Sequence, residues 1–542
     1  MSGASSGWNY ADVWEGVAHR FPDAPAVSFG TVTSTWRLFE SRAEAFAGGL
    51  LAAGTPHRGR VAQLQRNAPE YLEVLFACFK ASLAPVNTNY RYGVDELVYL
   101  WRDCDAAVVV FDAEFAATVD AARSRLPGVR RWVCTGPGDT CPPWATPYEA
   151  ILAAGLPCTP PWKRSGDDLY ILYTGGTTGR PKGVMWPQHE LFQMLEESRG
   201  RPVAERADPD AFVRRLPRPG PAVIPVAPLM HGTASWFAFP VLNRGGEVVL
   251  LPGASFDAVR TLDAIVEHAV KAICIVGEAF ARPILSALDT SPGRWNLDSL
   301  RVIQSSGAAL PPASKRRLLQ YARHAQIVDG LGSSESGVAA SAVSADDASE
   351  LSLFRPTSHT RVLDDNGEDV VPGSDTIGRL VVGGHLPMGY FGDPEKTAAT
   401  FVELDGKRYA ITGDQARVCH DGTIVLLGRG SSCINTGGEK VFPEEVEETL
   451  RALPGVADVA IVGVADDVLG ESVAAVVLPE PGVRLSDNDI VAHAKSVLAH
   501  YKAPRLVVFV SSFPRGPHGK VDQQKVRELA TAARRAIVSS PG

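Results

Sequence analysis

A short strand that runs directly into a loop of glycine and hydroxyl residues constrains this chain more than any other feature. Leu169–Tyr173 (LYILY) predicts a strand. The segment Tyr173–Gly183 (YTGGTTGRPKG) then offers backbone N–H groups and hydroxyl groups that can surround phosphate oxygens. It lacks the Gly-Lys-Ser/Thr ending of a Walker A loop, and Pro181 blocks a helix from starting in the P-loop manner. We therefore expect a phosphate-binding loop that is not that of an ordinary P-loop NTPase.

The chain is too long for one core. Its 542 residues exceed the roughly 250 to 300 residues at which single cores stop growing, and 45% hydrophobic and 21% charged residues are typical of globular proteins. A composition shift near Gly428–Ser432 predicts an N-terminal domain over 1–428, a hinge at 429–431 and a C-terminal domain over 432–542.

Both parts alternate helical and strand patterns. In the first, the pattern predicts a helix at Pro69–Lys80, strands at Ala106–Phe111, 247–251, 272–276 and 301–304, and a polar, Pro-rich surface excursion over 202–222. In the second, it predicts a helix from Pro443, strands at 457–464, 473–478 and 506–510, a helix at 488–500, and a short polar helix after Lys520. The alternation indicates an α/β layered N-terminal domain and a smaller α+β C-terminal domain.

Charge and targeting signals exclude several classes of protein. The net charge of −8 argues against a nucleic-acid partner. Met1–Trp8 lacks the pattern of a signal peptide, and no apolar run approaches the 18 or so residues that span a membrane, so we expect a cytoplasmic protein without a membrane span. The eight cysteines lack CxxC or Cys/His ligand spacing, which predicts free thiols and neither disulfides nor a zinc site.

Eight further segments are recognisable as motifs. They are PLMHG (228–232), GAAL (307–310), DGLGSSE (329–335), GYFG (389–392), YAITGD (409–414), GR (428–429), NTGGEKVFP (435–443) and PRGPHGK (514–520). With the phosphate loop, they resemble, in order and over about residues 30–525, the superfamily of adenylate-forming enzymes. That superfamily includes acyl-CoA synthetases, non-ribosomal adenylation domains and beetle luciferases.

This resemblance implies a reaction in two steps. AMP is transferred from ATP to a carboxylate with release of pyrophosphate, and a thiol then displaces AMP. Neither step needs a protein nucleophile, since catalysis is mostly positioning and charge stabilisation around phosphorus. The implied cofactors are ATP, Mg²⁺ and coenzyme A. The implied fold is a large N-terminal α/β domain of several sheets with a smaller, mobile C-terminal α+β domain.

The resemblance also assigns a nucleotide site. The triphosphate is expected at Thr174, Gly175, Gly176, Thr177, Thr178 and Lys182, and the rest of the nucleotide at Gly307, Ala308, Ala309, Asp329, Gly330, Leu331, Gly332, Ser334, Asp414 and Arg429. Glu335, with Thr174, would hold Mg²⁺, a hard cation that favours oxygen ligands. Lys520 would bridge the carboxylate and the α-phosphate. The resemblance places His231 beside the acyl channel as a catalytic residue. Two non-functional interpretations remain open: Lys182 could be a solvated surface charge, and His231 could be a histidine of the core.

The acyl pocket, the thiol tunnel and the hinge follow from the same motifs. The pocket wall is expected at His231, Gly232, Trp236, Val276, Gly277, Ser305 and Ser306, the coenzyme A tunnel at Gly437, Gly438, Glu439 and Lys440, and the hinge at Ser431. Amino-acid adenylation domains place an Asp in the segment that is HGTASW (231–236) here, so we expect an acid without an α-amine. Small and apolar wall residues favour a bulky hydrophobic acid. The motif variants most resemble actinobacterial CoA ligases for sterol side chains and other polycyclic acids, including diterpenoid precursors.

Three positions depart from the family pattern, and several alternatives stay open. Leu331 replaces the aromatic residue that stacks on adenine, Ser431 replaces the usual hinge Asp or Lys, and Arg379 interrupts the Gly-Glu-Leu run. The alternatives are a ligase that loads a separate acyl carrier protein, a luciferase-like oxygenase and an inactive binding scaffold. The charged set of Glu335, Asp414 and Lys520 argues against the scaffold. The natural acid and the oligomeric state, a homodimer included, stay open.

Overall fold

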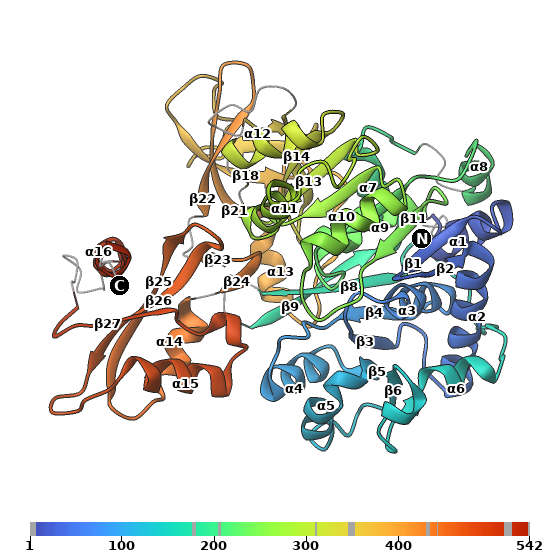
Figure 1. The fold of residues 1–542 in the computed structure, drawn as a ribbon, viewed down its shortest axis with the longest axis horizontal. Helices are drawn as coiled ribbons and strands as arrows, with labels where there is room; N and C mark the ends of the chain where they lie inside the picture. Colours follow the sequence, from blue (N-terminus) through green and yellow to red (C-terminus); the bar gives the residue numbers. More distant parts are fainter. Residues whose placement is uncertain are drawn as a thin grey trace.

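The chain folds into a large N-terminal lobe and a smaller C-terminal lobe (Figure 1). A computed structural model describes residues 7–175, 180–203, 208–308, 310, 312–344, 353–429, 434–441, 443–513 and 523–539. Within these residues, no helix has the length and apolar character needed to cross a bilayer.

Two large sheets form most of the N-terminal lobe. The eight-stranded sheet has the order β19 (Gly389–Tyr390), β9 (Pro181–Pro187), β8 (Leu169–Gly175), β4 (Ala84–Asn87), β3 (Arg60–Leu64), β5 (Ala106–Asp112), β6 (Arg131–Thr135), β7 (Thr146–Pro147). The nine-stranded sheet has the order β16 (Arg355–Pro356), β15 (Gly337–Ser344), β14 (Gln326–Ser333), β13 (Val302–Ser306), β12 (Ala272–Ile275), β10 (Ala222–Pro225), β11 (Glu247–Leu250), β1 (Pro25–Phe29), β2 (Val32–Thr35). Both are mainly parallel, with antiparallel strands at their edges.

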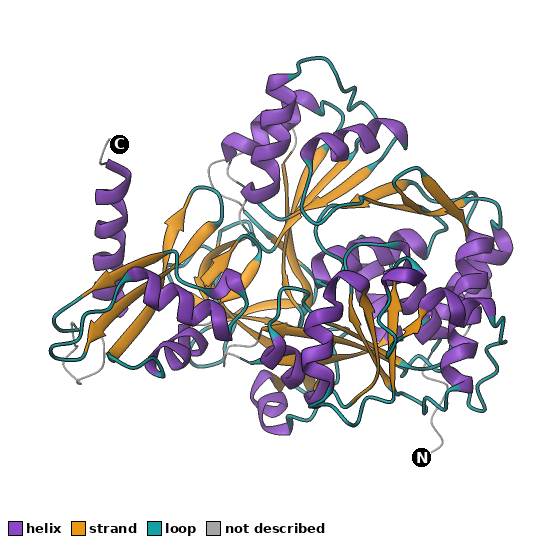
Figure 2. Cartoon of the chain, turned by 60° about the horizontal axis from the view of Figure 1, so that its bottom comes forward, coloured by secondary structure: helices purple, strands orange, loops and turns teal. Residues whose placement is uncertain are grey.

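Helices fill the space between these sheets and cover their outer faces (Figure 2). A large hydrophobic core joins both sheets to α1 (Tyr10–Arg20), α2 (Trp36–Ala52), α3 (Pro69–Lys80), α6 (Tyr148–Ala153), α7 (Gln188–Glu197), α8 (Pro209–Arg214) and α9 (Gly232–Leu242). A second core packs α4 (Val94–Asp103) and α5 (Ala116–Arg123) on the eight-stranded sheet, and a third packs α10 (Ala258–Glu267), α11 (Glu278–Thr290) and α12 (Pro312–Tyr321) on the nine-stranded sheet. Short 3₁₀ turns lie at Ala113–Phe115, Gly138–Thr140 and His500–Lys502.

A third sheet leads toward the C-terminal lobe. It has the order β17 (Thr360–Leu363), β18 (Ile377–Val382), β21 (Lys407–Val418), β20 (Phe401–Leu404), with β22 (Ile424–Arg429) also paired to β21 and α13 (Pro394–Thr400) beside it. The fourth sheet, in the C-terminal lobe, has the order β24 (Glu439–Val441), β23 (Ile434–Thr436), β26 (Gly470–Pro479), β25 (Val456–Asp466), with β27 (Leu506–Phe509) paired to β26. The third sheet therefore ends at Arg429, and the fourth begins at Ile434.

The C-terminal sheet has two differently covered faces. Alternate residues such as Ile461 and Ala475 pack with α14 (Pro443–Arg451) and α15 (Asp487–Val497) on one face. Their neighbours, such as Val462 and Val476, pack with α16 (Gln523–Ser539) on the other. This period of two is the ordinary geometry of a strand buried on both sides. In Figure 1, α16 lies on the outer side, away from the N-terminal lobe.

A proline at the helix start and aromatic packing explain how the central helices form and pack together. Helix α3 has Pro69 at its first turn, where the missing N–H is not needed, and its following residues are almost all buried between the sheets. Trp14 packs edge-to-face on Phe76 and Phe239, with ring centroids 5.3 and 5.8 Å apart. Such contacts join α1, α3 and α9 into one aromatic centre, a strong contribution to core stability.

Several predicted elements are confirmed and two differ. The Pro69–Lys80 helix is present with the expected ends, and Pro181 opens strand β9 rather than a helix. The excursion over 202–222 includes α8, whose Phe212 and Val213 are buried against the core, so this segment is more than a surface loop. The tail helix α16 is 17 residues long and buries Val526 and Ala530, so it belongs to the C-terminal core. The seven described cysteines are free, as predicted.

Candidate active site

The main cavity lies where the carboxyl ends of parallel strands from both large sheets meet. Asn87 ends β4, Ser306 ends β13, and Val276 directly follows β12; all three line the cavity. In open α/β sheets, ligands bind at this edge because the loops there are free to carry polar groups. The fold therefore explains why motifs far apart in sequence meet at one place.

Most of the predicted site residues that the structure describes reach this cavity. The wall includes, from the predicted nucleotide site, Thr174, Gly307, Gly330, Leu331, Gly332 and Ser334; from the predicted acyl pocket, His231, Gly232, Trp236, Val276 and Ser306; and from the predicted thiol tunnel, Gly438, Glu439 and Lys440. Ser305 lies behind this wall, 1% exposed, and its hydroxyl accepts the Gly277 N–H at 3.2 Å. Residues from all three predicted sites thus line one cavity, whereas Lys182, Asp329, Glu335 and Asp414 are not among its wall residues.

Close strand packing shapes the predicted nucleotide side of the cavity. A Cβ atom at Gly332 would lie 2.1 Å from the carbonyl oxygen of Gly337, and one at Gly330 would lie 2.5 Å from the Ser306 hydroxyl. Only glycine fits at position 332, because the neighbour there is backbone, whereas a larger residue at position 330 would force the Ser306 hydroxyl to move. Leu331, between them, contributes an aliphatic surface to the cavity.

A polar cluster lies beside the phosphate loop. Thr174 is the β8 partner of Lys182 on β9, and Lys182 forms an ion pair with Asp393 that lowers the pKa of this carboxyl group. The hydroxyl of Tyr390, near Lys182, donates to Glu335 Oε1 at 2.9 Å. The predicted phosphate ligands and the predicted metal ligand are therefore connected through Tyr390. Gly175 ends β8 at this place.

Asp414 lies on β21 and is 6% exposed. Its backbone partner on β22 is Arg429, so the two predicted ribose contacts are adjacent near the junction of the lobes. Asp329, predicted for the nucleotide site, forms an ion pair with Lys315. Burial raises the pKa of Asp329, although Lys315 opposes this effect. Asp329 is therefore engaged in a buried pair in this structure.

The hairpin of β23 and β24 packs against the N-terminal lobe. Glu439 is 6% exposed and accepts from His231 Nε2 at 3.2 Å, from Asn89 Nδ2 at 3.3 Å and from Arg91. Burial alone would raise the pKa of Glu439, but His231, Arg91 and Lys502 hold it at about 2. Glu439 is thus a charged contact between the lobes.

Two further contacts fix this docked arrangement. At Gly438, with φ of +86°, an added Cβ atom would lie 2.6 Å from Val276 Cγ1. The Lys502 ammonium contacts Glu96 of the N-terminal lobe and Glu445 of the C-terminal lobe, each at 2.7 Å. Burial would lower the pKa of Lys502, but the two carboxylates raise it above its usual range. The C-terminal lobe therefore places its Gly437–Lys440 turn at the cavity.

Six predicted residues lie outside the described part of the chain: Gly176, Thr177, Thr178, Ala309, Ser431 and Lys520. Ala308 is described beside Gly307. The described residues on either side of the Lys520 segment, Phe513 and Val526, pack in the outer core of the C-terminal sheet. That face is opposite to the one covered by α14 and α15.

Sequence reasoning missed several residues of the cavity. Asn87 donates to the carbonyl oxygens of Tyr173 and Met230 at 2.9 and 2.7 Å and accepts the Tyr173 N–H at 2.6 Å, so it fixes the strand before the phosphate loop. Arg199 and Lys502 also line the cavity. None of these residues belongs to a recognisable motif, and only the fold brings them to the site.

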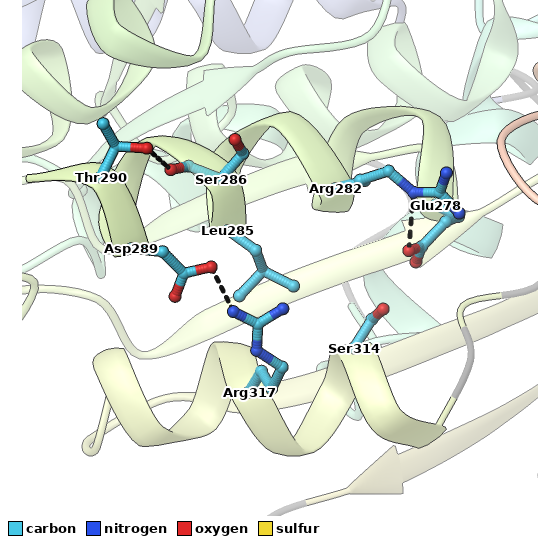
Figure 3. Close-up of a pocket in the computed structure, with 8 residues that line it drawn as sticks. All are labelled: Glu278, Arg282, Leu285, Ser286, Asp289, Thr290, Ser314 and Arg317. Carbon is cyan, nitrogen blue, oxygen red and sulfur yellow. Dashed lines mark hydrogen bonds and ion pairs between the residues drawn. The ribbon is translucent and has the colours of Figure 1, made fainter.

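A second pocket lies between α11 and α12 (Figure 3). Its charged groups pair with one another: Arg317 with Asp289, and Arg282 with Glu278 at 3.5 Å. None of the predicted site residues that the structure describes lines this pocket. The main cavity is therefore the candidate active site.

Comparison with known proteins agrees with this geometry. The family described as AMP-binding enzyme matches residues 14–391, and the family described as AMP-binding enzyme C-terminal domain matches residues 445–520. The chain belongs to the family of AMP-binding enzymes.

It is similar to the medium-chain acyl-CoA ligase Mig of Mycobacterium avium, with 36% identity over 98% of this chain and 100% of the relative. It is also similar to the 3-oxocholest-4-en-26-oate–CoA ligase of Rhodococcus rhodochrous, with 36% identity over 96% of this chain and 95% of the relative. The chain is an acyl-CoA synthetase, that is, an acid–thiol ligase that uses ATP and CoA.

Solved structures share the fold of this synthetase. The amide bond synthetase McbA of Marinactinospora thermotolerans superimposes with a TM-score of 0.79 at 25% identity, covering 96% of this chain and 99% of that one. The anthranilate CoA ligase AuaEII superimposes with a TM-score of 0.69 at 24% identity, covering 98% and 99%. The expected fold class, a large α/β lobe of several sheets with a smaller C-terminal lobe, is confirmed.

Proposed function

We propose that this synthetase activates a bulky, largely apolar carboxylic acid that lacks an α-amine, and transfers it through an acyl-AMP intermediate to coenzyme A. One observation carries the choice of acid: among the described residues that line the cavity, Glu439 is the only carboxylate, and it is bound by His231 and Arg91. A substrate ammonium group would find no carboxylate partner there, and a buried unpaired charge is costly.

The apolar part of the cavity wall supports a bulky acid as the substrate. Leu195, Trp236, Val276 and Val338 line the cavity together with glycines and serines, which leave room beside the large side chains. Burial of apolar surface is worth about 25 cal/mol per Å², so a large hydrocarbon skeleton gains the most from such a wall. The relative named for a sterol side-chain acid supports a bulky substrate, whereas the relative named for medium-chain acids supports only its apolar character.

For the first half-reaction we assign charge stabilisation to three groups. Lys182 and the Thr174 hydroxyl would bind phosphate oxygens, and Lys520 would contact the α-phosphate as negative charge develops on it. The Lys182–Asp393 pair implies that incoming phosphate competes with Asp393 for this ammonium. Asp414 would accept the ribose hydroxyls, with Arg429 beside it.

The residues around Glu335 fit a magnesium ion. One carboxylate and a nearby hydroxyl, completed by phosphate oxygens and water, form a typical Mg²⁺ site. Tyr390 holds Glu335 Oε1, which orients the carboxylate. Glu335 and Thr174 would hold the ion, and its chemistry there would be to neutralise phosphate charge.

We assign the docked arrangement of the two lobes to the second half-reaction, in which the thiol displaces AMP. The Gly437–Lys440 turn lies at the cavity, where thiol would enter, while the described neighbours of Lys520 pack in the outer core of the C-terminal sheet. Rotation of the C-terminal lobe about Ser431 would exchange the two faces between the steps. His231, held by Glu439, would border both the acyl channel and the thiol path.

The test is a screen of carboxylic acids with ATP, Mg²⁺ and coenzyme A, read by pyrophosphate release and by mass spectrometry of the thioester. We expect sterol side-chain or polycyclic acids to give higher kcat/KM than acetate or medium-chain fatty acids. A clear preference for acetate would contradict the proposed substrate class. Acyl-AMP that accumulates without acyl-CoA would instead indicate a carrier-protein acceptor.

A further inference from the structure

Arg199 supplies a positive charge to the wall of an otherwise largely apolar part of the cavity. It follows the last turn of α7, and its neighbours along the wall are Leu195, Ser198 and Trp236. An arginine side chain carries five N–H donors and stays protonated in proteins. Such a group in a cavity wall requires partners, since a desolvated charge without them is unfavourable.

The protein satisfies Arg199 only in part. Its Nη1 donates to the carbonyl oxygen of Leu195 at 3.0 Å, and its Nη2 donates to that of Trp236 at 3.1 Å. Within the described part of the chain, no carboxylate pairs with this guanidinium. The adjacent Glu196 is bound by Arg244 at 2.5 Å and by Asn243 at 3.2 Å. Glu197 is bound by His359 at 3.0 Å.

Two other enclosed cations, both lysines, are paired with carboxylates. Lys80 contacts Glu15, Glu40 and Glu44, and Lys502 contacts Glu96 and Glu445. Buried ion pairs of this kind are the usual way to hold a charge inside a protein. Burial lowers the pKa of Arg199 because water is lost around it, and the charge of Glu196 opposes this effect. Within the described residues, Arg199 nevertheless forms no ion pair with Glu196, which Arg244 binds, and its guanidinium lines the cavity.

The position of Arg199 is remote from the reacting end of the cavity. Glu439 of the Gly437–Lys440 turn contacts His231, which lies immediately before α9. Arg199 instead contacts the carbonyl oxygen of Trp236 inside that helix. Five residues of helix correspond to about 8 Å along its axis. An acid whose carboxylate lies near His231 would therefore extend its far end toward Arg199.

We infer that Arg199 is a specificity-determining residue that binds an oxygen acceptor, a ketone or a second carboxylate, at the end of the substrate remote from the reacting carboxylate. This inference rests on the proposed function, because it takes the cavity to be the acyl site. A carbonyl or carboxylate oxygen accepts the free N–H groups of the guanidinium, whereas a hydrocarbon end leaves them unsatisfied. Sites built to bind a polar group reject the analogue that lacks it.

The experiment compares acids that share a skeleton and differ only at the far end. The pairs are octanedioate with octanoate, and 9-oxodecanoate with decanoate, because their extended chains place the far oxygen closest to the separation between His231 and Arg199. For each, kcat/KM for acyl-CoA formation is measured in the wild type, in Arg199→Met and Arg199→Lys, and in Arg130→Met, an exposed control on the N-terminal lobe.

The wild type and the control should prefer the oxygenated member of at least one pair by ten- to a hundredfold, the order expected for a hydrogen bond to a charged group. Arg199→Met should remove the preference by slowing only the oxygenated acid, and Arg199→Lys should keep part of it. A structural defect would slow both members of a pair equally and leave their ratio unchanged.

Two results would overturn the inference: equal use of both members of each pair by the wild type, or an unchanged preference in Arg199→Met. Failure of the proposed function looks different, because the wild type would then form no thioester from any of the four acids. The ratio within a pair is measured in the wild type as well, so the test holds even if Arg199→Met is poorly folded.

Discussion

Neutralising Glu439 should weaken the docking of the C-terminal lobe and slow thioester formation. This carboxylate is 6% exposed and contacts His231, Arg91 and Asn89 of the N-terminal lobe. Its pKa of about 2 lies below the ordinary value of 4.5. A difference of this size corresponds to at most about 3 kcal/mol in favour of the charged, docked form, since Lys502 of the same lobe supplies part of the shift. Glu439→Gln keeps the shape of the side chain but leaves the cations without their partner.

The expected result follows from the direction of the pKa shift. Because docking lowers the pKa, Glu439 supports docking fully above pH 4.5, and this support is lost as pH falls toward 2. At neutral pH, Glu439→Gln should therefore reduce the rate of acyl-CoA formation from supplied acyl-AMP by up to about a hundredfold. Pyrophosphate release in the first step should change less than about threefold, since the lobe must leave this arrangement for that step.

The assay measures both half-reactions of Glu439→Gln beside Glu480→Gln, which changes an exposed carboxylate of the same lobe. Rapid-quench measurement of thioester from synthetic acyl-AMP gives the second step, and a coupled pyrophosphate assay gives the first. Equal slowing of both steps, or an unchanged thioester rate, would refute the reasoning that Glu439 acts by docking the lobe.

Two further substitutions test the thiol path and the hinge. Gly438→Trp should block acyl-CoA formation while acyl-AMP still forms, because even a Cβ atom there would lie 2.6 Å from Val276; a normal thioester rate in a stopped-flow assay would contradict this placement. Ser431→Pro should fix φ and trap one arrangement of the lobes, so that one half-reaction is slowed far more than the other; equal losses in the two assays would count against the hinge role.

The sequence alone predicted the elements whose chemistry is local. The Pro69–Lys80 helix was predictable because its proline begins the helix and its apolar residues recur with helical spacing. The β8 strand was predictable from its run of apolar and aromatic residues, and the absence of a helix at Pro181 was predictable because proline restricts the backbone there. The wall glycines Gly307 and Gly332 were found through motifs, and the structure places them in the cavity.

Residues whose role depends on long-range contacts were not predictable. Glu439 was expected at a thiol tunnel from its motif, but its contacts with Asn89 and His231 join segments more than 200 positions apart. Arg199 resembles any surface arginine in the sequence, since charged residues are usually exposed. Only the packing of α7 against α9 and β15 places its charge in the cavity wall.

The central claim is that opposite faces of the C-terminal lobe serve the two half-reactions, and Lys520→Ala tests it most directly. Pyrophosphate release should fall by on the order of a hundredfold or more, because a cation that stabilises developing phosphoryl charge is lost. Conversion of supplied acyl-AMP to acyl-CoA should stay close to the wild-type rate. Pyrophosphate release at the wild-type rate in Lys520→Ala would contradict the assignment of this lysine and the division of labour built on it.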